Sequence, residues 1–119
     1  MGSANYDYRC KLVRWIDGDS CVLDIDLGFG LTKRETVRLA GSDAPEMHGQ
    51  DKLAGEAALA FVISLVPVGE LVTARTYKPS RSEDRYGRWL ADVFLDLLTT
   101  VSSRMIEAGH AVPYFGGRR

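Results

Sequence analysis

Acidic and basic side chains gather at three places in this 119-residue chain where a folded domain has no structural need for them. Residues 17–20 read Asp-Gly-Asp-Ser, a tight turn that aspartate also favours for backbone reasons. Residues 38–46 combine an arginine with an aspartate and a glutamate, and a proline stiffens the loop between the two acids. Residues 84–88 read Asp-Arg-Tyr-Gly-Arg. Each group alone is ordinary for a turn or a surface, so the interest lies in their combination.

The combined residue types suit the hydrolysis of a phosphodiester. Attack of water adds negative charge to a centre that is already anionic, so the site must supply positive charge. Arginine does this with a planar fork that grips phosphate oxygens and stays charged. A carboxylate near a metal can position or deprotonate the attacking water. Because neither histidine nor cysteine joins the groups, the all-oxygen set of ligands predicts a hard divalent cation.

The order of these motifs along the chain resembles the staphylococcal nuclease (thermonuclease) family. The pattern D-G-D-[ST] fits residues 17–20, and R-L-x-x-x-D-x-P-E fits residues 38–46. An alanine-rich segment follows, D-R-Y-G-R fits residues 84–88, and Gly-x-Ala fits residues 109–111. The resemblance extends over residues 8–114, and four motifs in one order are far more specific than any single one.

The resemblance implies a calcium site built from oxygen ligands. Asp19 and Asp43 would bind Ca²⁺ through their carboxylates, and the backbone carbonyl of Ala44 would add a third oxygen. Asp17 is expected to support these ligands rather than bind the ion. Ala44 stands where the family often has threonine, a change of little consequence for a backbone ligand. With only two carboxylates on the ion, the site is expected to be weak until a substrate phosphate completes it.

The resemblance also implies the residues that act on the substrate. Glu46 would orient or deprotonate the attacking water, and Arg38 and Arg88 would clamp the scissile phosphate. Arg38 has an alternative interpretation as a plain surface residue on a strand whose neighbours face the core. Three further residues are expected to contact the nucleotide, namely Arg85, Tyr86 and Tyr114.

The implied activity is that of a calcium-dependent phosphodiesterase that hydrolyses DNA, RNA or both with low sequence specificity and leaves 3′-phosphate ends. Low specificity fits contacts to phosphates, which carry no base identity. Two alternatives stay open. A non-catalytic nucleic-acid- or protein-binding module of the same family has no need for all five charged residues, and a structural calcium-binding domain leaves the arginines unexplained. The five are Asp19, Arg38, Asp43, Glu46 and Arg88.

Five short strands and two helices are predicted to position these residues. The strands are expected at residues 8–16, 21–27, 35–40, 71–77 and 90–95, and the helices at residues 51–66 and 99–108. One helix after the third strand predicts a mainly β, α+β fold, a five-stranded OB-type barrel. The third, C-terminal helix of the best-known relative is absent.

Hydrophobic periodicity predicts which faces of these elements are buried. The first strand is expected to bury Tyr8, Cys10, Leu12 and Ile16. In the longer helix, Leu53, Ala57, Phe61 and Leu65 form one apolar stripe, with Ala54, Ala58 and Val62 beside it. The shorter helix is expected to bury Val101, Met105 and Ala108. The tryptophans, Trp15 and Trp89, are expected in the barrel core rather than in base stacking. Gly55 weakens the longer helix by about 1 kcal/mol relative to alanine.

The two cysteines are predicted to be reduced and buried. If Ile16 lies opposite Cys21 in the first hairpin, then Cys10 lies opposite about residue 27. The two sulfurs would then be about 20 Å apart, too far for a disulfide. Unpaired cysteines and the lack of a visible secretory signal favour an intracellular location, with secretion left open.

The composition indicates one globular domain, since 45% of residues are hydrophobic, 26% are charged and the net charge is −1. Residues 1–7 are interpreted as a disordered N-terminus or cloning remnant, residues 8–115 as the domain and residues 116–119 as a flexible tail. No apolar stretch is long enough for a membrane span. The expected partner is a DNA or RNA substrate, and the expected state is a monomer.

Overall fold

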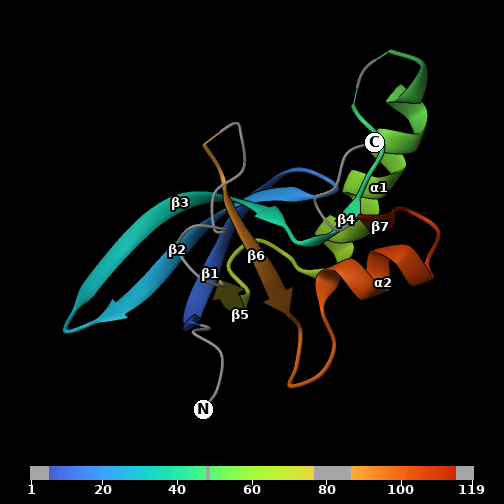
Figure 1. The fold of residues 1–119 in the computed structure, drawn as a ribbon. Coiled ribbons are helices and arrows are strands. Elements are labelled where there is room, and N and C mark those ends of the chain that lie inside the picture. The colour runs from blue at the N-terminus through green and yellow to red at the C-terminus, as the bar shows by residue number, and fades with distance from the viewer. Residues whose placement is uncertain (1–5, 48, 77–86, 115–119) are drawn as a thin grey trace.

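A computed structural model describes residues 6–47, 49–76 and 87–114, and its centre is a closed barrel of five strands (Figure 1). The barrel strands are β1 (Tyr6–Asp17), β2 (Ser20–Gly28), β3 (Leu31–Leu39), β5 (Leu71–Thr76) and β6 (Trp89–Phe94). Their order around the barrel is β1-β2-β3-β6-β5. The β3–β6 pair is parallel, and every other pair in the barrel is antiparallel. The predicted α+β barrel is therefore confirmed.

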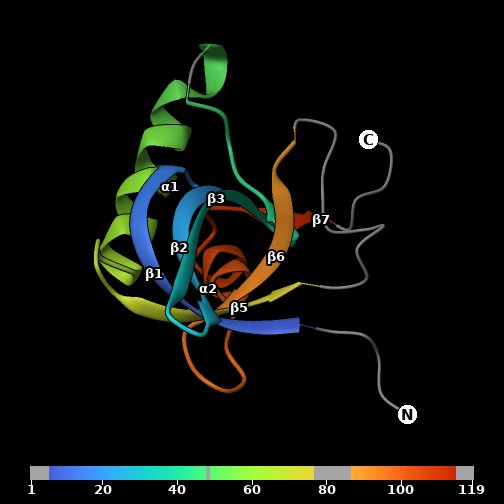
Figure 2. The same ribbon diagram turned by 90° about the vertical axis from the view of Figure 1, so that its left-hand side faces the viewer.

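Two helices and a small second sheet complete the described fold. The helices are α1 (Lys52–Leu65), preceded by the 3₁₀ turn η1 (Gly49–Asp51), and α2 (Val101–Glu107). The second sheet pairs β4 (Gly41–Asp43) with β7 (Val112–Tyr114). Seen along the barrel, α1 lies beside β1, whereas α2 lies behind the barrel opening (Figure 2). Neither α-helix in the described ranges is long and apolar enough to cross a membrane.

The buried face of β1 changes partway along the strand. Cys10 and Leu12 are buried as expected, but the next buried side chain is Trp15, and Ile16 is 39% exposed. The pairing of β1 with β2 is irregular between Leu12 and Arg14 and again just after Trp15. An extra residue at such a bulge moves the following side chain to the opposite face. The expectation that Ile16 is buried was wrong for this reason.

The two cysteines are unpaired and buried, as predicted. The register differs from the predicted one, because Cys21 lies opposite Trp15 and Cys10 lies opposite Ile25. Burial raises the pKa of the Cys10 thiol to about 11 and raises the pKa of the Cys21 thiol further. Both thiols therefore act as small hydrophobic groups of the core.

The apolar face predicted for α1 is buried only in part, since Ala58 and Val62 are buried but Ala54 is exposed. Leu53 is 81% exposed and Ala57 is also exposed, whereas Phe61 and Leu65 are only half-buried. Periodicity identified the helix, and Phe61 and Leu65 pack against the edge of the core, whereas Leu53 is exposed to solvent. The face that packs inward is the one with the smallest side chains, which lets the helix backbone approach its neighbours closely.

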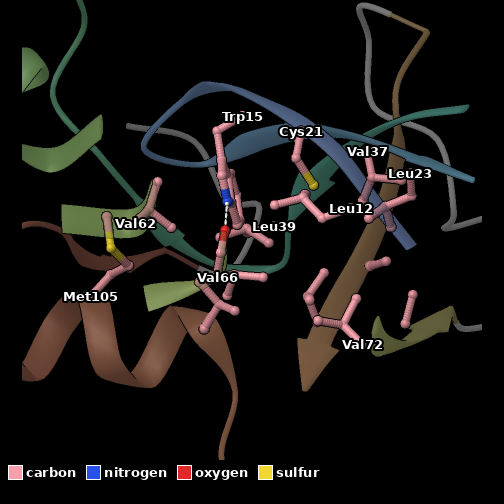
Figure 3. Close-up of a cluster of buried hydrophobic side chains, with 14 of the residues drawn as sticks. Leu12, Trp15, Cys21, Leu23, Val37, Leu39, Val62, Val66, Val72 and Met105 are labelled. Carbon is pink, nitrogen blue, oxygen red and sulfur yellow. Dashed lines mark hydrogen bonds between the residues drawn. The ribbon is translucent and has the colours of Figure 1, made fainter. Parts of the chain in front are cut away.

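That inward face consists of Gly55, Ala58 and Val62. The helix is anchored at its end, where the Trp15 indole N–H donates a hydrogen bond of 3.0 Å to the carbonyl oxygen of Val66 (Figure 3). Trp15 is thus a core residue, as predicted, with its polar N–H satisfied. Trp89 is half-buried and packs against the same core.

The last helix and the segment after it differ from the prediction at their ends. In α2, Val101 and Met105 are buried, but Ala108 is exposed because the helix ends at Glu107. No strand was predicted after residue 108, yet β7 pairs with β4. The pairing brings Tyr114 opposite Gly41. The strand β7 has only three residues, too few to show a hydrophobic period in the sequence. The expected tail at 116–119 and most of the expected N-terminal segment lie outside the described residues.

Candidate active site

The turn between β1 and β2 holds the Asp-Gly-Asp motif at the rim of the barrel. The Asp19 backbone N–H donates to Oδ1 of Asp17 at 3.0 Å, so Asp17 closes the turn. A Cβ atom at Gly18 would lie 2.8 Å from Cβ of Ala44 and 3.0 Å from Cβ of Ala58. Glycine therefore lets this turn pack directly against the loop after β4 and against α1.

Asp19 is only 7% exposed, and polar groups surround its carboxylate. Its Oδ1 accepts from the Ser20 hydroxyl at 3.3 Å, and its Oδ2 accepts from the Ala44 backbone N–H at 3.0 Å. The Arg38 Nη2 atom lies 3.5 Å from the same Oδ2. These contacts join the β1–β2 turn to β3 and to the loop after β4.

Burial raises the pKa of the Asp19 carboxyl to about 6, and the neighbouring Asp17 carboxyl adds to the rise. The Ala44 N–H and the Arg38 guanidinium oppose it. Burial and a neighbouring acid both make the ionised carboxylate unfavourable. A positive charge that approaches Asp19 would offset both effects and is therefore attracted to the site.

The Arg38 side chain is 11% exposed and is not a plain surface residue. Its Nη1 atom donates to the backbone oxygens of Leu39 at 2.8 Å and Ser42 at 3.1 Å. Its Nη2 atom donates to Oδ1 of Asp43 at 3.1 Å. Arg38 thus holds β3, β4 and both predicted metal-binding carboxylates together, and a planar fork is needed to reach them all.

Two buried serines fix the strand that carries Asp43. The Ser102 hydroxyl donates to the Ala40 carbonyl oxygen at 2.6 Å and lies 2.9 Å from the Ser42 hydroxyl. Since the single Ser102 proton points to Ala40, the Ser42 hydroxyl is the donor of the second bond. The pair ties α2 to β4. Sequence reasoning missed it, because isolated serines carry no signal of this kind.

Arg88 joins the site through Ser20. The Arg88 Nη1 atom donates to the Ser20 hydroxyl oxygen at 2.8 Å, and Ser20 in turn donates to Asp19. The parallel pairing of β3 with β6 explains the location, since Arg38 is opposite Leu90 in the register. Arg38 on β3 and Arg88, the residue just before β6, are therefore neighbours at one end of the barrel although they are far apart in sequence. The sequence analysis did not identify Ser20, which links Arg88 to Asp19.

Tyr114 reaches the site from β7. The Arg38 guanidinium carbon lies 5.2 Å from the centre of the Tyr114 ring, a cation–π distance. Glu46 lies on the irregular loop after β4, two residues beyond Ala44, and its side chain is exposed. The other expected substrate contacts, Arg85 and Tyr86, lie outside the described residues.

The chemistry of this site fits a hard cation. One oxygen of Asp19 and one of Asp43 are within 3.5 and 3.1 Å of the same nitrogen, Nη2 of Arg38. Oxygen ligands of this kind suit calcium or magnesium. Across residues 6–47, 49–76 and 87–114, no group of three His, Cys, Asp or Glu side chains could hold a metal ion. A site with two carboxylates needs backbone, water or substrate oxygens to complete its shell.

Comparison with known families gives one match. Residues 36–119 match the model of the family described as staphylococcal nuclease homologue. The matched range contains Arg38, Asp43, Glu46 and Arg88, whereas the Asp19 turn precedes it and joins the site through the contacts above. A search of curated proteins found no significant match.

Proposed function

The chain belongs to the family of staphylococcal nuclease homologues, and on this premise we propose that it is a calcium-dependent nuclease for DNA, RNA or both. It cleaves with low sequence specificity and leaves 3′-phosphate ends. The observation that carries the proposal is the contact network of Asp19, Asp43, Arg38 and Arg88 at one end of the barrel. This network combines acidic oxygens for a cation with two guanidinium groups for a phosphate.

The two arginines bind the scissile phosphate in this proposal. Their guanidinium groups are held in place before substrate arrives, by backbone oxygens for Arg38 and by Ser20 for Arg88. Groups positioned in advance stabilise the developing charge without reorganising during the reaction. Phosphate oxygens would replace some of the acidic oxygens that now face Arg38.

Asp19, Asp43 and the backbone carbonyl of Ala44 would hold calcium, with Asp17 closing the turn beneath them. Bound calcium supplies positive charge at the phosphate and makes a nearby water more acidic. Glu46 orients this water or takes its proton. The exposed side chain of Glu46 lies on the loop that begins at Ala44, which is itself tied to Asp19 by a hydrogen bond.

A cleavage assay with purified protein tests the proposal. Plasmid DNA and RNA are incubated with calcium, with magnesium and with a chelator. We expect cleavage with calcium, loss of cleavage with the chelator, and a fall of at least about 100-fold for Glu46→Gln. Glu56→Gln is the matched control, because Glu56 is an exposed acid on α1. A chain that binds nucleic acid but never cleaves it would instead be a binding module.

A further inference from the structure

We propose that Gly55 is a positioning residue that sets the location of Glu46, an inference that rests on the proposed nuclease function. Gly55 lies in the first turns of α1 and is buried. A Cβ atom built on it would overlap the carbonyl oxygen of Glu46 and would lie 2.6 Å from the Glu46 carbonyl carbon. It would also lie 3.0 Å from Cα of Met47. The helix backbone therefore contacts the loop backbone directly.

The close contact with the loop backbone, rather than an unusual backbone conformation, explains why residue 55 is a glycine. Gly55 is inside a regular helix and does not have the positive φ angle that favours glycine elsewhere in the chain, for example at Gly49. In a helix interior, glycine is less favourable than alanine by about 1 kcal/mol. The sequence thus keeps a poor helix former where the loop backbone lies against the helix.

The loop that carries Glu46 is bonded to the Asp19 turn at its start and rests on α1 further along. Residues 44–46 belong to no helix or strand. At the start of the loop, the Ala44 N–H is bound to Asp19. Glu46 is beyond that bond, so its backbone rests on α1 at Gly55. The helix surface therefore fixes how far Glu46 is from the Asp19 turn.

A methyl group at position 55 must move the loop, because the atoms that it meets belong to the loop backbone rather than to a flexible side chain. Movement of a catalytic group by about 1 Å can lower a rate by about 100-fold. The three atoms nearest to such a methyl group belong to Glu46 and Met47 rather than to Asp19 or Arg38, so cation and phosphate binding are expected to persist.

The first test compares Gly55→Ala with the wild type at saturating calcium. We expect kcat to fall about 10- to 100-fold while KM and the calcium affinity, measured by calorimetry, change less than about threefold. Ala57→Gly is the matched control, because it perturbs the helix at an exposed position and is expected to leave kcat unchanged. Amide NMR signals of Glu46 and Met47 are expected to shift more than those of Ala44 and the Asp19 turn.

A double-mutant cycle shows whether Gly55 acts through Glu46. In the Glu46→Gln background, Gly55→Ala is expected to cause no further loss of kcat. An equal loss of kcat in both backgrounds would overturn the proposal. An unfolded Gly55→Ala chain would also overturn it, because the contact would then be needed for folding rather than for positioning Glu46. An active wild type with an unaffected Gly55→Ala variant contradicts only this inference. An inactive wild type contradicts the proposed function, and the NMR shifts still report whether residue 55 positions the loop.

Discussion

The carboxylate of Asp19 is buried next to a second acid, and its surroundings oppose its ionisation. Because burial raises the pKa of Asp19 from 3.8 to about 6, protonation of this group favours the folded state. Its contribution to stability is fully present below about pH 3.8 and is lost as the pH rises through about 6. At neutral pH the folded, metal-free protein therefore carries an unfavourable buried charge.

We predict that Asp19→Asn stabilises the metal-free protein at pH 7.5 by roughly 1–2 kcal/mol. A shift of one pKa unit corresponds to about 1.4 kcal/mol of stability. The full gain is not expected, because the asparagine amide replaces only part of the hydrogen bonding of the carboxylate. The gain should shrink as the pH falls from 7 to 4. Thermal unfolding in the presence of a chelator measures both effects. The same variant should lose calcium-supported cleavage. A lower Tm at pH 7.5 than that of the wild type would contradict the argument.

At the scale of elements, the site depends on contacts between short segments. The strand β4 has only three residues, and it is held by β7 on one side and by the Ser42–Ser102 hydroxyl pair on the other. The Ser42 carbonyl oxygen in turn accepts from Arg38. A change on α2 is therefore transmitted to the arginine through β4.

We predict that Ser102→Ala destabilises the protein by about 1–3 kcal/mol, because the Ala40 carbonyl oxygen and the Ser42 hydroxyl lose a buried partner. Denaturant unfolding measures the change. Ser103→Ala is a neighbouring control at an exposed position of the same helix, although it also removes a bond within the helix turn. If the two variants were equally stable, the buried pair would not be the support for β4 that we describe.

The elements also show what the sequence can and cannot predict. Strands, helices and the charged motifs were found because each depends on neighbours within a few residues. The buried position of Gly55 on α1 was not predicted, because its contact with Glu46 and Met47 joins segments that are distant in the local pattern. The position of Ile16 depends on a bulge, which adds a residue without changing the local pattern. Ser102 belongs to the site only through the packing of α2.

At the scale of the whole molecule, the net charge of −1 provides no general attraction to nucleic acid. Two arginines hold the proposed phosphate site, and further basic residues are concentrated in residues 75–88 of the sequence. Few phosphates are therefore expected to be contacted at once.

We predict a weak dependence of KM on salt. With two to four phosphate contacts, a plot of log KM against log salt concentration should have a slope of about 1.5 to 3.5. The measurement uses a single-stranded and a double-stranded substrate at constant free calcium, with kcat recorded as the control for calcium loss. A slope above about 6 would indicate a much wider basic surface than the two arginines provide.

The pairing of β4 with β7 has a consequence for biosynthesis. Asp19 and Tyr114 are 95 residues apart in the sequence, yet both lie against Arg38. The ribosome must therefore add those 95 residues after Asp19 before both groups can meet at Arg38. A nascent chain holds an incomplete pocket throughout that interval.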